Sequence, residues 1–154
     1  MAEKGHLYFI PILEAKYPDD YKILVLYILC AICDDYITGQ AACFNEKLLQ
    51  ICLSLLTHKN SQIRQWSALT LGMLWNNFAQ AKNTAANESA HVKLCALLSD
   101  SVPEVRASAA FALGTFISTD KENSNPKRDT MEVNIGLTLR SITNVKNNTE
   151  ASPM

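Results

Sequence analysis

Residues 97–117, LLSDSVPEVRASAAFALGTFI, decide the fold of this chain. They predict the end of one helix, a short polar turn and a second helix. Pro103 suits the first helical position, where its missing N–H would have no partner, and Glu104 favours the positive end of the helix dipole. The apolar residues after Glu104 recur at helical spacing, and others lie outside that stripe. We therefore expect this helix to have neighbours on more than one side, as in a stack.

The composition describes one folded, all-α domain. The chain has 154 residues, of which 48% are hydrophobic and 19% charged, with a formal net charge of −1. This is enough chain for a real core, and the near-zero charge gives no electrostatic reason to expect nucleic acid as a partner. The strongest apolar run, residues 23–33, is shorter than the ~20 residues that span a bilayer, so no transmembrane segment is expected.

The cysteines indicate a structural role and no reactive or metal-binding site. Five are present, an odd number, and most lie in apolar helical surroundings; they are Cys30, Cys33, Cys43, Cys52 and Cys95. Cys30 and Cys33 have the spacing of a metal-ligand pair, but no second Cys or His pair follows at zinc-finger distance. We expect small, buried, reduced thiols, as in a cytosolic or nuclear protein.

Breaks in the apolar periodicity divide the chain into helices. We expect helices at about 5–14, 19–36, 44–57, 61–78, 88–98 and 103–118. Pro11 should interrupt or end the first. Thr38, Gly39 and Gln40 should separate the second from the third, and the polar residues 81–88 should form a loop.

These helices suggest four regions along the chain. Residues 1–118 are expected to hold about three helix pairs, followed by a polar loop at 119–129. Residues 130–145 should form the first helix of an incomplete further repeat, and 146–154 a disordered tail. An incomplete last repeat leaves an apolar face uncovered. We therefore expect the chain to be a piece of a longer protein, or a partner to cover that face.

An internal repeat selects the architecture. Seven residues of 97–114 match residues 42 positions earlier in type, and a fainter copy lies 42 further back; the pairs are Leu97, Leu98, Val105, Arg106, Ala110, Leu113 and Gly114 with Leu55, Leu56, Ile63, Arg64, Ala68, Leu71 and Gly72. A two-helix unit of about 40 residues is typical of HEAT or armadillo repeats. The expected fold is an all-α, right-handed α-solenoid of HEAT/armadillo-like helical hairpins.

The segment from Asp100 to Gly114 is similar to the HEAT consensus, in which an Asp and an Arg form a polar ladder between neighbouring repeats. That resemblance makes Asp100, Arg106 and Arg64 the candidate ladder residues. His58 stands where the second repeat should carry the Asp, so the ladder is in doubt there.

A second set of residues is expected to pack the repeats together. Trp66 and Trp75 are the largest apolar groups and are interpreted as core residues, with Leu71 and Leu113 on the apolar stripes. A glycine inside a helix costs about 1 kcal/mol relative to alanine. Gly72 and Gly114 should therefore mark places where helices approach closely.

No residue pattern predicts catalysis. His6, His58 and His91 are far apart in sequence, and His91 is expected on an exposed helix face. Asp34 and Asp35 are adjacent on a helix and so do not face a common site; at a helix C-terminus they favour a basic partner side chain. We predict no catalytic, cofactor-binding or metal-binding residue, no cofactor, and no enzymatic activity.

Four segments together resemble the helical-repeat region of the Raptor family, the regulatory scaffolds of TOR complex 1. Arg64-Gln65-Trp66 and Trp75–Phe78 are the most specific matches; the segments are GHLYFIPIL (5–13), ITGQAACF (37–44), residues 63–78, and residues 89–117. The resemblance covers about residues 5–118. In that family the solenoid lies between a caspase-like domain without protease activity and a WD-repeat propeller, neither of which is in this sequence.

The resemblance implies a non-catalytic scaffold or adaptor fragment of TOR complex 1. Its implied partners are the helical repeats of TOR kinase and other subunits or substrates of the complex, in nutrient-responsive signalling that regulates growth. A cytoplasmic location follows, with association with the lysosomal or vacuolar surface through the complex. The alternative is a generic HEAT-repeat interaction or transport adaptor, whose shared motifs are only repeat consensus.

Overall fold

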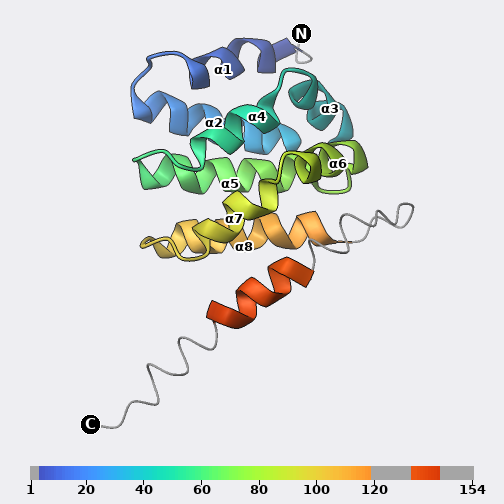
Figure 1. The fold of residues 1–154 in the computed structure, drawn as a ribbon. Helices are drawn as coiled ribbons and strands as arrows, with labels where there is room; N and C mark the ends of the chain where they lie inside the picture. The colour runs from blue at the N-terminus through green and yellow to red at the C-terminus, as the bar shows by residue number, and fades with distance from the viewer. Residues whose placement is uncertain (1–3, 119–132, 143–154) are drawn as a thin grey trace.

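The computed structural model describes residues 4–118 and 133–142. Three long helices form its central row: α2 (Asp19–Cys33), α5 (Ser61–Trp75) and α8 (Pro103–Ile117). They lie side by side, with α5 packed between α2 and α8 (Figure 1). The expected solenoid of helical repeats is confirmed, and the described residues contain no strand.

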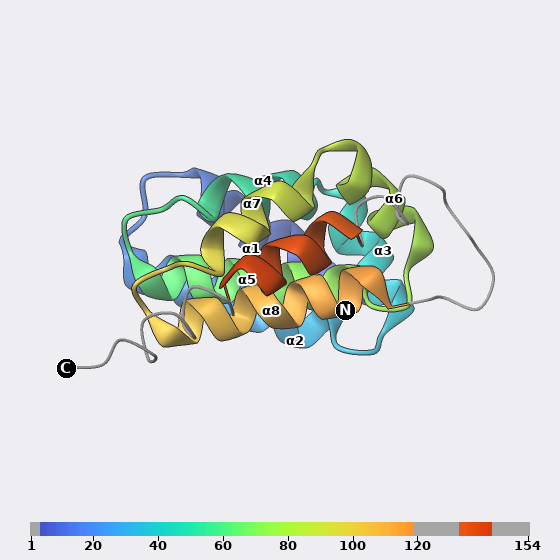
Figure 2. The ribbon, with the colours of Figure 1, turned by 60° about the horizontal axis from the view of Figure 1, so that its bottom comes forward.

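Shorter helices form a second row along the long ones. This row consists of α1 (Gly5–Glu14), α4 (Leu48–Leu55) and α7 (Ala90–Leu97), each packed on one long helix. Figure 2 shows α4 and α7 along one side of the stack, with the helical residues 133–142 beside α7 and α8. Ile135 of that last segment is only 1% exposed, so the segment packs on the same core.

Two further helices were not expected from the sequence. They are α3 (Ile37–Asn45) and α6 (Ala79–Asn87), and they lie where the long helices end (Figure 1). The predictions that residues 38–40 separate two helices and that residues 81–88 form a loop are wrong. Residues 38–40 lie inside α3, and residues 81–87 lie inside α6. The physical reason is burial: Ala81, Ala85 and Ala86 of α6 are buried, so a polar-looking stretch has an apolar face made of methyl groups.

The repeat is therefore a unit of three helices. Every bound of α3, α4 and α5 returns 42 residues later in α6, α7 and α8, and α2 precedes α5 by the same 42 residues. The turns repeat as well: φ is 48° at Asp35 and 54° at Asn77, and 63° at Lys47 and 55° at Ser89. Asp and Asn tolerate this left-handed conformation better than most residues do. Helix α2 ends at Cys33, earlier than the expected residue 36, and the left-handed residue Asp35 follows it.

One other prediction differs from the structure. Pro11 lies inside α1, and the helix continues to Glu14 without a break. The expected loop at 119–129 and tail at 146–154 lie outside the described residues. Of the helix expected at 130–145, residues 133–142 are described and are helical.

Candidate functional site

The strongest polar link between repeats joins α5 to the turn before α8. Nε of Arg64 donates to Oδ2 of Asp100 at 2.9 Å, and Nη2 donates to Oδ1 at 3.0 Å. This bidentate geometry is the favoured one for an arginine and a carboxylate. The hydrogen bonds from Arg64 hold the pKa of Asp100 below its usual range. Asp100 also accepts the backbone N–H of Val102 at 3.0 Å, so the same carboxylate orders the turn.

Both arginines also bind the turn of their own repeat. Nη1 of Arg106 donates to the carbonyl of Asp100 at 2.8 Å. Nη1 of Arg64 makes the equivalent bond to the carbonyl of His58 at 2.9 Å. The structure thus brings Arg64, Asp100 and Arg106 together at one turn, where they position helices.

We call α1 and α2 the first layer of the stack, α3–α5 the second and α6–α8 the third. The link between the first and second layers uses different residues. Asp19 at the start of α2 accepts Nδ2 of Asn60 at 3.1 Å, and Nε2 of His58 lies 3.8 Å from its other oxygen. The acid therefore comes from the earlier layer, whereas Asp100 comes from the later one. His58, which stands at the ladder position, therefore still makes a polar contact with the neighbouring layer, from its ring Nε2 to the carboxylate of Asp19.

The predicted packing residues lie between the layers, with one exception. Trp75 is fully buried; its Nε1 donates to Oγ1 of Thr115 at 2.9 Å, and its ring meets Phe116 edge-on. Trp66 is half-buried and meets Tyr27 of α2 edge-on at 5.2 Å between ring centroids. Leu71 and Leu113 are buried in the core.

The two glycines differ. A Cβ on Gly72 would lie 2.6 Å from Cε1 of Phe111 and 3.2 Å from Cα of Ala112, so α5 and α8 do approach closely there. A Cβ on Gly114 would meet nothing within 4 Å. The expectation of a close approach at Gly114 is therefore wrong: Gly114 faces away from α5, and no described residue crowds it.

The structure shows a second set of polar contacts, within each repeat, that was not predicted from the sequence. Gln40 of α3 is buried, and its Nε2 donates to the carbonyls of Met73 and Asn76, each at 2.8 Å. Lys82 of α6 is fully buried, and its Nζ donates to the carbonyl of Ser118 at 3.0 Å. Each short helix thus supplies a donor to the carbonyl end of a long helix. The 42-residue spacing of Gln40 and Lys82 could have indicated that they play the same role in the repeat. It was missed because glutamine and lysine do not count as a match when residues are compared by type.

The histidines form no reactive cluster. His91 is 9% exposed, which contradicts its expected exposed position, because α7 turns that face toward its neighbours. No group among the described residues forms a hydrogen bond with its Nδ1, and burial lowers the pKa of His91. Within residues 4–118 and 133–142, no group of three or more His, Cys, Asp or Glu side chains could hold a metal ion.

The surroundings of most cysteine thiols raise their pKa values. Burial raises the pKa of Cys30 to about 11 and raises that of Cys52 as well. A hydrogen bond with Cys43, together with burial, raises the pKa of Cys33. The same hydrogen bond lowers the pKa of Cys43. Since the thiolate is the reactive form, the raised pKa values of Cys30, Cys33 and Cys52 disfavour reactivity at neutral pH.

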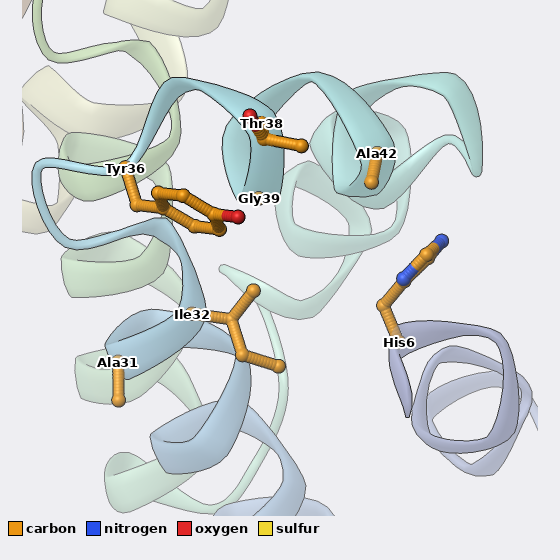
Figure 3. Close-up of a pocket in the computed structure, with 7 residues that line it drawn as sticks. All are labelled: His6, Ala31, Ile32, Tyr36, Thr38, Gly39 and Ala42. Carbon is orange, nitrogen blue, oxygen red and sulfur yellow. The ribbon is translucent and has the colours of Figure 1, made fainter. Parts of the chain in front are cut away.

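A pocket lies between α1, the end of α2 and α3. Its volume is about 640 Å³, and its wall is mostly apolar with three polar groups; the lining residues are His6, Ala31, Ile32, Tyr36, Thr38, Gly39 and Ala42. Figure 3 shows His6 facing the pocket from α1, opposite Ile32 and Tyr36. Gly39 allows α3 to approach α2, because a Cβ there would lie 2.4 Å from the carbonyl oxygen of Ile32.

Exposed apolar side chains gather on α2. Tyr21, Leu24 and Tyr27 are each more than half exposed. Their equivalents 42 residues later include Trp66, which is covered by Tyr27 of the preceding layer. The open face of α2 therefore has the character of a surface that packs against another layer. None of the described helices is long and apolar enough to cross a membrane.

Comparisons with known proteins extend this description. The HEAT repeat family model matches residues 48–78 and 93–119. The chain is 42% identical over 144 residues to a protein raptor homolog of Dictyostelium discoideum, covering 93% of this chain and 9% of that protein. It is 37% identical over 124 residues to the target of rapamycin complex 1 subunit mip1 of Schizosaccharomyces pombe, covering 76% of this chain and 9% of that protein.

A solved structure agrees with these sequences. The crystal structure of Chaetomium thermophilum Raptor matches with a TM-score of 0.82 and 32% sequence identity, covering 88% of this chain and 13% of that chain. The chain thus spans only about a tenth of the length of the proteins that it matches.

Proposed function

Because this chain is homologous to the HEAT-like repeat region of Raptor, we propose that it is a non-catalytic scaffold segment of TOR complex 1. In this proposal it contacts the helical repeats of TOR kinase and helps to present substrates in nutrient-responsive signalling. The same proposal gives it a cytoplasmic location, with recruitment to the lysosomal or vacuolar surface through the complex.

One observation carries the proposal: 42% identity that extends over 93% of this chain. A match through repeat consensus alone would concentrate at the core positions that all HEAT repeats share. The similarity instead runs through turns and short helices, which consensus matching does not require. A second relative is named as a subunit of target of rapamycin complex 1, which sets the complex to be tested.

The structure is suited to a scaffold. Layers of helices provide extended surfaces, and stability in such solenoids comes from contacts between neighbouring layers. The polar residues singled out in the sequence, Arg64, Asp100 and Arg106, are engaged in holding helices together. The HEAT repeats and the homologues indicate a scaffold-type protein.

The decisive experiment is a segment exchange. Residues 5–118 of this chain replace the matching segment of the Schizosaccharomyces pombe subunit, and the kinase retained on purification of the tagged chimera is measured. We expect retention close to that of the unaltered subunit. The control replaces the same segment with HEAT repeats of unrelated sequence, which should retain little kinase.

Folding of the chimera is checked by its expression level and sedimentation. A folded chimera that retains no more kinase than the control would overturn the proposal. It would favour the alternative of a generic HEAT-repeat adaptor.

A further inference from the structure

Four of the five cysteines lie together in the core, at the boundary between the first and second layers. Cys30 and Cys33 belong to α2, Cys43 to α3 and Cys52 to α4. Cys33 forms a hydrogen bond with Cys43 and interacts electrostatically with Cys30 and Cys52. Cys33, Cys43 and Cys52 are fully buried, and Cys30 is 8% exposed. The four side chains therefore form one cluster of thiols.

Packing alone does not require thiols at these positions. The equivalent residues 42 positions later are all buried and contain no cysteine; they are Gly72, Trp75, Ala85 and Leu94. Where Cys33 and Cys43 contact each other, the next repeat has an indole ring and a methyl group. The fold can thus fill this space without sulfur, so the contact between two thiols adds a chemical property that the stack itself does not need.

The backbone brings Cys33 and Cys43 close together. A Cβ on Gly39 would lie 2.4 Å from the carbonyl oxygen of Ile32, so α3 approaches α2 closely at this point. Cys33 follows Ile32 directly, and Cys43 lies about one helical turn after Gly39. A disulfide needs two sulfur atoms about 2.05 Å apart on residues whose Cα atoms are less than about 7 Å apart. Thiols that already share a hydrogen bond can reach this geometry by side-chain rotation and a small shift of α3.

We propose that Cys33 and Cys43 are a modification site, at which a hydroperoxide converts the two thiols into a reversible disulfide that joins the first layer to the second. With hydrogen peroxide, two thiols and one peroxide give one disulfide and two water molecules. The two sulfur atoms together lose two electrons, and the peroxide oxygens gain them. Intracellular disulfides are typically transient bonds of this kind.

The hydrogen bond assigns the two sulfurs their roles. The thiol of Cys33 donates to the sulfur of Cys43, which favours the thiolate form of Cys43. Cys43 therefore attacks the peroxide; the O–O bond breaks, and a sulfenic acid and one water form. The sulfur of Cys33 then attacks the sulfenic sulfur, and the S–O bond breaks. The proton of Cys33 leaves with that oxygen as the second water. A dithiol reverses the reaction by thiol–disulfide exchange.

Opening of α3 controls the reaction, because both sulfurs are fully buried. Helix α3 has nine residues, too few for a stable isolated helix, and Gln40 holds it by hydrogen bonds to the carbonyls of Met73 and Asn76. The disulfide would fix α3 on α2 and, through Gln40, hold the end of α5 as well. Oxidation thus makes the contact between two layers more rigid. This inference does not depend on the proposed role in TOR complex 1, since it concerns the isolated chain.

Peptide mapping tests the bond in the full 154-residue chain carrying Cys30→Ala. The chain is treated with hydrogen peroxide, the remaining thiols are blocked with N-ethylmaleimide, and the product is digested without reduction. Trypsin leaves residues 23–47 as one peptide, and cleavage before Asp34 and Asp35 separates Cys33 from Cys43. We expect peptides 23–33 and 35–47 to be linked, with the loss of two hydrogen atoms, and dithiothreitol to release them. In the unaltered chain, fragmentation of the linked peptides distinguishes Cys30 from Cys33.

Matched variants test the assignment of the two sulfurs. Cys43→Ala introduces the residue that the next repeat has at the equivalent position, Ala85, and it should abolish the bond. Cys52→Ala removes another thiol of the cluster and should leave the bond intact. Circular dichroism melting verifies that both variants fold.

Two measurements test the coupling to α3. Gln40→Ala removes the hydrogen bonds that hold α3, so the disulfide should form about fivefold faster. In the oxidised unaltered chain, amides of residues 40–44 should exchange hydrogen at least about tenfold more slowly than in the reduced chain.

Three results would overturn the proposal. The first is that Cys33 and Cys43 stay unlinked while Cys95, a more exposed thiol, is oxidised. The second is a disulfide of Cys33 or Cys43 with Cys52 as the main product. The third is unchanged hydrogen exchange in α3 after complete oxidation.

Discussion

Arg64 is the single side chain that ties the most elements together. It makes a bidentate ion pair with Asp100 of the next repeat and hydrogen bonds to the carbonyls of His58 and Lys59 in its own. Its side chain is 16% exposed and that of Asp100 only 9%, so the pair is mostly removed from solvent. Removing one partner of such a pair leaves the other without its charge or its hydrogen bonds.

We expect Arg64→Ala to lower the free energy of unfolding by about 3 kcal/mol. Arg106→Ala is the matched control, because Arg106 makes the equivalent bond to a carbonyl but no ion pair among the described residues; it should cost about 1 kcal/mol. Urea unfolding of the two variants measures the difference. Equal losses in both would show that the ion pair with Asp100 contributes nothing.

The ion pair also predicts how stability depends on pH. The pKa of Asp100 is lowered in the folded state, mainly by its hydrogen bonds with Arg64. The stability from this group is therefore fully present above the unfolded pKa of about 3.9, and it is lost as the pH falls through the lower folded value. The comparison is with Asp100→Asn, which has no charge at any pH. The difference in unfolding free energy between the chain and this variant should shrink as the pH falls below about 3.9, and a constant difference would contradict the prediction.

At the scale of single helices, the packing of α5 and α8 is asymmetric. Gly72 on α5 faces Phe111 and Ala112 of α8, whereas Gly114 on α8 has open space around it. The two glycines are 42 residues apart and occupy the same position in the repeat. The same substitution should therefore have opposite effects at the two positions.

Gly114→Ala should stabilise the chain by up to about 1 kcal/mol, because alanine has the higher helix propensity and its Cβ meets nothing. Gly72→Ala should destabilise it by about 1–3 kcal/mol, because the Cβ would displace the ring of Phe111 and press on the α8 backbone. Thermal melts of the pair test this directly. A stabilising Gly72→Ala would mean that α5 and α8 separate at little cost.

The sequence predicted these long helices and their period, since apolar residues at helical spacing and matched residues at 42 positions are both visible in one chain. It did not predict α3 and α6. Gly39, Gln40 and Lys82 look like loop residues, and helices of nine residues have little intrinsic stability in isolation. They form because tertiary contacts satisfy them: Gln40 and Lys82 are buried against carbonyl ends that only the folded stack creates.

For the molecule as a whole, the sequence predicts the solenoid and marks Asp100, Arg106 and Arg64 as candidate ladder residues. It could not predict the pocket, because the lining residues come from α1, α2 and α3 and share no local pattern. The packing of the three long helices against one another also predicts how stability is distributed.

In a stack where each layer contacts only its neighbours, the middle layer should be the most stable. The long helix α5 packs against both α2 and α8, whereas α1 and residues 133–142 lie at the two ends (Figure 1). Amides of α5 should therefore exchange hydrogen only through global unfolding, and those of residues 133–142 at least about tenfold faster through local opening. Native-state hydrogen exchange at increasing denaturant measures this gradient. Trp75→Leu, which removes the contact with Thr115, should lower protection in α5 and α8 together while α1 keeps its own rate. Equal protection in every helix would show that the layers unfold as one unit.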